Sequence, residues 1–108
     1  MSGSGGGGYG GGFYGEGVAC EKIVIHTQLS SPVAVVVAQL SVGDVLDVVG
    51  QQGKISMLVV AKFHGQVAGG LADAQISRVL ECLRDGYGYK ATVTAISGGQ
   101  VKVRVEVR

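Results

Sequence analysis

The sequence has no tryptophan, a single proline and no long apolar run. Its longest apolar stretch, 33–38, is far shorter than the roughly 20 residues that a membrane-spanning helix needs. The first residues also lack the basic stretch and the apolar stretch of a secretory signal peptide. These absences predict a soluble, cytoplasmic protein with no membrane partner.

Cysteine is almost as scarce as proline, with only Cys20 and Cys82 in the chain. The two lie far apart in the sequence, which is unlike the dense spacing of a small secreted disulfide scaffold. We therefore expect two small, buried, apolar thiols, one in a strand and one in a helix.

Net charge is also nearly absent, because nine Lys and Arg residues face eight Asp and Glu residues for a net charge of +1. This balance excludes the broad positive field on which general nucleic-acid binding relies. Any contact with nucleic acid must therefore depend on a local basic patch.

Motifs for catalysis, metals and cofactors are missing as well. Cys20, His26, His64 and Cys82 have the chemistry of zinc ligands, but no pair shows the short spacing of a structural zinc site. The burial expected for both cysteines leaves neither as an activated nucleophile. The glycines at 65–70 lack the lysine and the hydroxyl residue of a phosphate-binding loop. We therefore predict no catalytic residue, no metal, no cofactor and no small-molecule substrate.

Half of the 20 glycines lie in the first 17 residues. This segment has no apolar periodicity and cannot bury enough surface to offset the entropy of ordering it. We expect a disordered Gly-rich tail over 1–17, followed by a single β-rich binding domain over 18–108.

Most of that domain has the pattern of short strands rich in β-branched residues. The clearest covers 100–107, where Val101, Val103, Val105 and Val107 alternate with charged residues, so that one face is predicted to be buried and the other exposed. Further strands are predicted at 19–27, 45–49, 54–62 and 87–96, with a short strand at 66–69 left open.

Two helices complete the pattern. Ile76, Val79, Leu80 and Leu83 recur at helical spacing and predict a long amphipathic helix over about 72–84. Residues 32–40 favour a short helix because serine and proline precede apolar residues at the same spacing, although their valines also suit a buried strand.

This order of elements predicts an α+β, mostly β fold. The expected architecture is a small, partly open, OB-like β-barrel of five or six antiparallel strands. A flatter α+β sheet with both helices packed on one face is the alternative.

Four segments occur in order from Leu40 onward: LSVGDVLDV from Leu40, GQVAGGL from Gly65, ISRVLECLRDG from Ile76 and YKATVT from Tyr89. Their layout resembles that of HIRAN domains, small OB-like modules that hold the 3′ end of a single strand in some DNA-repair helicases. The resemblance implies an OB-like fold over about 40–96. At 50–53, where HIRAN domains have a longer loop with Asn, Asp and an Ala-Ile pair, this chain has only GQQG, so no binding residue is carried over.

The exposed side of the last strand is the candidate functional surface, and a basic residue of the preceding strand can lie beside it. A local basic patch with tyrosines as stacking platforms is how OB-type modules hold single-stranded nucleic acid. The alternative is an ordinary solvated face whose charge Glu106 moderates. The candidate nucleic-acid-binding residues are Lys90, Lys102, Arg104, Arg108, Tyr87 and Tyr89.

Two functions follow from this pattern and remain open. The first is a non-enzymatic module that binds single-stranded nucleic acid through the basic face. The second is a protein interaction or oligomerisation module, which pairs an edge strand with a protein partner or a second copy and has no nucleic-acid role.

Overall fold

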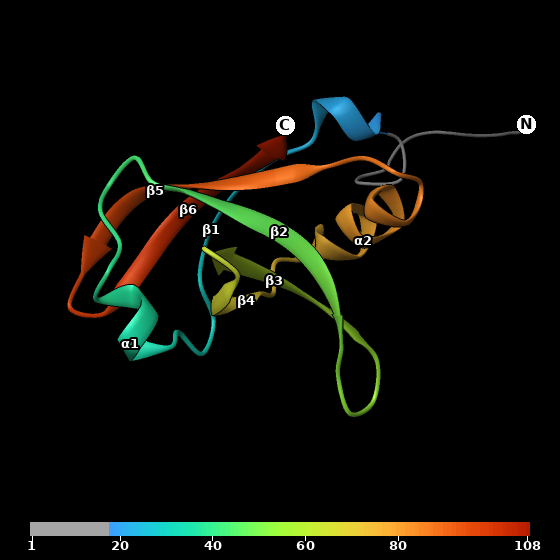
Figure 1. The fold of residues 1–108 in the computed structure, drawn as a ribbon. Helices are drawn as coiled ribbons and strands as arrows, with labels where there is room; N and C mark the ends of the chain where they lie inside the picture. The colour runs from blue at the N-terminus through green and yellow to red at the C-terminus, as the bar shows by residue number, and fades with distance from the viewer. Residues whose placement is uncertain (1–17) are drawn as a thin grey trace, which may run out of the picture.

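The computed structural model describes residues 18–108, which form one curled antiparallel sheet of six strands (Figure 1). The mostly β, antiparallel fold predicted from the sequence is confirmed. The tail predicted over 1–17 lies outside the described residues. In sheet order the strands are β1 (Val24–Gln28), β6 (Gln100–Val107), β5 (Tyr89–Ser97), β2 (Val45–Gln52), β3 (Met57–Phe63) and β4 (Gln66–Leu71).

Strand β6 lies at the centre of the core, as its alternating valines predicted. Val101 and Val105 are 0% exposed and Val103 is 1% exposed, while Lys102 lies on the solvated side. The neighbouring strand β5 places Tyr89, Ala91 and Val93 on the same buried side. The sheet therefore has a dry inner face and a wet outer face.

The two edges of the sheet meet at one point, which makes the sheet a curled half-barrel. Beyond the end of β1, the Ser30 N–H donates to the Gly70 carbonyl at 2.9 Å, and the Gly70 N–H donates back to the Ser30 carbonyl at 2.8 Å. The Val33 N–H also donates to the carbonyl of Ala68 at 2.8 Å. This curl decides against the flatter sheet considered as an alternative.

Helix α2 (Ile76–Arg84) is shorter than the helix predicted over 72–84. The N–H of Gln75 donates to a carboxylate oxygen of Asp73 at 2.9 Å, so residues before Ile76 form a turn in place of a first helical turn. The predicted apolar face is correct, because Ile76 and Val79 are buried. Only the start of the helix was wrong.

Helix α1 (Ala34–Val37) confirms the short helix favoured within 32–40, although it has only four residues. Its inward residues, Val36 and Val37, are buried. The Ser-Pro start signal does not cap it, because the residue before the helix is Val33, whose N–H is bonded to β4.

Several strand ends differ from the sequence prediction. The first predicted strand, 19–27, divides into a 3-10 helix, η2 (Cys20–Lys22), and the strand β1. Strand β2 continues to Gln52, beyond the predicted end at 49. Strand β3 begins at Met57, later than the predicted start at 54. The short strand left open at 66–69 is β4.

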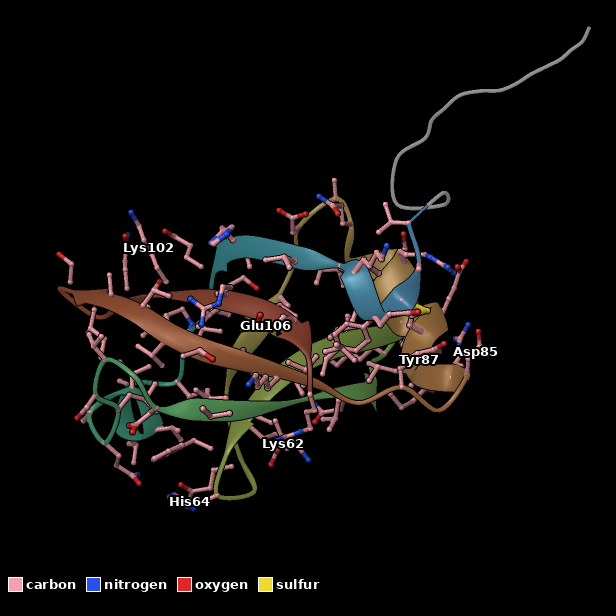
Figure 2. The ribbon with its side chains drawn as sticks, turned by 90° about the horizontal axis from the view of Figure 1, so that it is seen from above. Lys62, His64, Asp85, Tyr87, Lys102 and Glu106 are labelled. Atoms are coloured by element: carbon pink, nitrogen blue, oxygen red, sulfur yellow. A yellow bond between two sulfur atoms is a disulfide. The ribbon has the colours of Figure 1, made fainter. Side chains whose placement is uncertain are left out.

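Cys20 and Cys82 are joined in a disulfide, so the prediction of two separate buried thiols was wrong (Figure 2). The curl of the sheet brings η2 beside α2, with a distance of 5.8 Å between the two Cα atoms. Two further contacts hold this N-terminal segment. The Tyr89 hydroxyl donates to the carbonyl of Cys20 at 2.5 Å, and the Arg78 guanidinium donates to the carbonyl of Val18.

The buried Tyr89 leads to a prediction about alkaline pH. Burial raises the pKa of this phenol above its ordinary value of 10.0, and the nearby charge of Arg78 offsets only part of that effect. Between pH 10 and the raised pKa, the folded state keeps a proton that the unfolded state loses. The free energy of unfolding is therefore highest below pH 10 and falls as the pH rises through the raised pKa of Tyr89. An absorbance titration should show one of the four tyrosines ionising after the others, and Tyr89→Phe should remove that late phase. Ionisation of all four together would contradict the prediction.

Candidate functional site

The outer face of the sheet is organised by strand register into rows of neighbouring side chains. Each row crosses β1, β6 and β5, and two rows continue onto β2. Residues in one row lie about 5 Å apart, close enough for their side chains to interact. The rows are Gln28, Lys102 and Ala95; His26, Arg104, Thr92 and Val45; and Val24, Glu106, Lys90 and Asp47.

These rows bring three of the four basic candidate residues to one surface. Lys90, Lys102 and Arg104 lie on the outer face of β5 and β6. Arg108, just beyond β6, forms a salt bridge with Asp47 of β2. The basic residues therefore share one face of the sheet, but Lys90 lies two rows from Lys102, so they do not form a single cluster.

The two tyrosine candidates do not belong to this surface. Tyr89 is 1% exposed and packs in the core, so its ring is inaccessible to a base. Tyr87 is exposed, but Figure 2 shows it beside Asp85 at the opposite end of the sheet from Lys102. The outer face therefore has no stacking platform from either residue.

Charge is distributed unevenly along the outer face. Arg104 donates from Nε to Glu106 at 2.8 Å, and this hydrogen bond lowers the pKa of the Glu106 carboxyl below its ordinary value. Lys90 lies between Glu106 and Asp47 in its row. Lys102, by contrast, forms no salt bridge with any residue from 18 to 108. The acidic side chains thus neutralise one end of the face and leave the Lys102 end positive.

An open groove of about 470 Å³ lies at this positive end, over β1, β6 and β5. The pairing of β5 with β6 is irregular between Val93 and Ala95, so Thr94 lies in a bulge at the edge of the groove. Among the residues that the structure describes, no carboxylate lines the groove. Its lining residues are His26, Thr27, Gln28, Thr94, Lys102 and Val103.

Sequence reasoning missed His26, Gln28 and Thr94 as partners of Lys102. The alternation of β1 does place His26 and Gln28 on the same side of that strand. However, only the pairing of the first strand with the last puts both beside Lys102 and Arg104, and no local pattern specifies that pairing. The bulge at Thr94 has no glycine or proline to mark it.

Residues 18–108 contain neither a cluster of metal ligands nor a helix suited to a membrane. Across 18–108, no three His, Cys, Asp or Glu side chains gather in a way that could hold a metal ion. No helix of these residues has the length and apolar character needed to span a membrane.

No family model, curated protein or solved structure matches this chain. The likeness to HIRAN domains therefore stays a prediction from the sequence. Functional inference depends on the groove and on the charges around it.

Proposed function

We propose that the protein is a non-enzymatic, OB-like binding module that holds single-stranded nucleic acid on the outer face of β1, β6 and β5. The observation that carries this proposal is the open groove beside Lys102, which has donors and neutral polar groups but no carboxylate in its lining. An anionic chain can enter such a groove without meeting a like charge. The predicted likeness to HIRAN domains agrees with the proposal.

The ligand is held by its phosphates. Lys102 lies at the positive end and is the cation best placed to neutralise a phosphate. Arg104, one row along the face, is shared with Glu106, and Lys90 lies between Glu106 and Asp47, so these two cations contribute less. Because neither candidate tyrosine faces the groove, stacking of bases on tyrosine contributes little to binding.

The disulfide bears on the compartment in which this module works. Disulfides persist in oxidising compartments and are rare in the cytosol. Cys20 and Cys82 are both buried, and their bond weighs against the cytoplasmic location expected from the sequence. Binding experiments should therefore use the oxidised protein.

The proposal is tested by fluorescence anisotropy of a labelled single-stranded oligonucleotide over a series of salt concentrations. We expect a slope between about −0.7, for the contact of Lys102 alone, and about −2, for all three cations, in log K against log salt, because each phosphate contact contributes about −0.7 on a single strand. Lys102→Glu should weaken binding about tenfold or more, since one contact is replaced by repulsion. Arg84→Glu, on the exposed side of α2, makes the same change of charge away from the groove and serves as the control.

Binding that is absent at low salt, or equal loss in both variants, would overturn the proposal. Absence of nucleic-acid binding together with capture of a defined protein partner would favour the interaction module considered from the sequence. Retained binding by Lys102→Glu with the wild-type salt slope would place the ligand elsewhere on the chain.

A further inference from the structure

One edge of the sheet, that of β1, keeps unpaired backbone groups. The Leu29 N–H donates to Val101 of β6 at 2.8 Å, which fixes the odd-numbered residues of this segment as those bonded to β6. The N–H and C=O groups of Val24, His26 and Gln28 therefore point away from β6. Within residues 18–108, none of them takes part in a backbone hydrogen bond.

The opposite edge of the sheet is protected. On β4, the backbone groups of Ala68 and Gly70 are bonded to Val33 and Ser30. Strand β1 contains no lysine, no carboxylate, no proline and no bulge, which are common devices that blunt an edge, and its edge is paired with β4 only beyond its end, at Ser30. The backbone groups on the edge of β1 can therefore pair with another strand, whereas those of Ala68 and Gly70 on the edge of β4 already have partners within the chain.

We propose that this edge pairs with the same edge of a second copy, antiparallel about a two-fold axis at His26. His26 then lies opposite His26 of the partner subunit, and Val24 lies opposite Gln28 of the partner subunit. Because the free groups belong to residues placed symmetrically about His26, every one of them gains a partner in this register. The edge is therefore complementary to itself.

Charge favours a second copy over a charged foreign strand. Apart from His26, the five residues of β1 carry no ionisable side chain, so the edge has no charge with which to select an acidic or basic peptide. In the dimer, the β6 strands of the two copies are three strand spacings apart, or roughly 14 Å. That distance exceeds the screening length of about 8 Å at physiological salt, so repulsion between the two Lys102 and Arg104 pairs is weak.

The dimer also has a structural consequence. A two-fold axis perpendicular to the sheet leaves the outer faces of both copies on the same side. The two grooves beside Lys102 then share one continuous surface, one on each side of the new seam.

Sedimentation equilibrium of the oxidised protein over a concentration series tests the inference. We expect a monomer–dimer equilibrium for the wild-type chain and its loss in both His26→Lys and His26→Glu, because each variant sets like charges opposite each other at the axis. An equimolar mixture of the two variants should recover the dimer as a heterodimer. A wild-type chain that is monomeric at every concentration would overturn the inference, as would a mixture that stays monomeric.

Gln28→Pro provides a second, independent variant. The N–H that proline removes is unpaired in the monomer, so the substitution blocks edge pairing without removing a bond within the chain. Thermal unfolding should show that this variant is folded. A folded Gln28→Pro protein that dimerises as strongly as the wild type would rule out pairing through β1.

Discussion

Reduction of the Cys20–Cys82 disulfide should lower the free energy of unfolding by about 4 kcal/mol. The bond joins residues 62 positions apart, and closing a loop of that length removes a large amount of conformational entropy from the unfolded chain. A loss of this size is a considerable part of the 5–15 kcal/mol that stabilises a typical domain.

Urea denaturation with and without reductant measures this effect, with a thiol assay to show that reduction is complete. A variant with both cysteines replaced by alanine is the control, because its midpoint should not respond to reductant. Its own stability should be slightly below that of the reduced wild type, since both sulfur atoms are removed from the core. An unchanged midpoint after complete reduction would show that the disulfide contributes nothing to the fold.

Gly69→Ala should destabilise the protein by about 1–3 kcal/mol, because it forces an extra methyl group into the seam of the half-barrel. An added Cβ at this position would lie 2.9 Å from the Cβ of Leu29 and 3.2 Å from the carbonyl oxygen of Ser30. Neither atom can move away freely, since Leu29 is bonded to β6 and Ser30 is bonded to Gly70. The substitution therefore strains the contact that joins the two edges of the sheet.

Gly88→Ala is the matched control for this prediction. Its added Cβ would lie 3.5 Å from the Cδ of Arg108, an ordinary contact with a long, exposed side chain. The urea midpoint of Gly88→Ala should be close to that of the wild type, and the midpoint of Gly69→Ala should fall clearly below it. Equal midpoints for the two variants would mean that the seam tolerates a methyl group.

The parts of the fold that the sequence predicted well depend on local periodicity. Val101, Val103 and Val105 of β6 are buried as expected, as are Ile76 and Val79 of α2, because alternation and helical spacing indicate which side faces the core. The other predicted inward residues are partly buried and pack against that core: Leu80, Leu83 and Val107. The start of α2 was not predictable from spacing, since it depends on the hydrogen bond between Asp73 and Gln75. Periodicity identifies a helix face better than it identifies a helix end.

The candidate site was predicted less completely, and Tyr89 shows why. Lys90 and Tyr89 are adjacent in one strand, so they point to opposite sides of the sheet. Assigning Lys90 to the wet face therefore already required Tyr89 to be buried, together with Ala91 and Val93. The alternation of the strand therefore places Tyr89 inside whenever Lys90 is outside.

The disulfide and the groove could not have been predicted in the same way. Both depend on the order of strands in the curled sheet, which places Cys20 near Cys82 and His26 near Lys102. Strand order is a property of the whole chain. No spacing pattern in the segments involved specifies it.

The most direct test of nucleic-acid binding is the affinity of the oxidised protein for a single-stranded oligonucleotide, measured for Lys102→Glu and Arg84→Glu at one low salt concentration. We expect Lys102→Glu to bind about tenfold more weakly than the wild type, because the groove loses its central cation. Arg84→Glu, with the same net charge, should retain nearly all of the affinity. Equal affinities for the two variants would contradict a binding site at this groove.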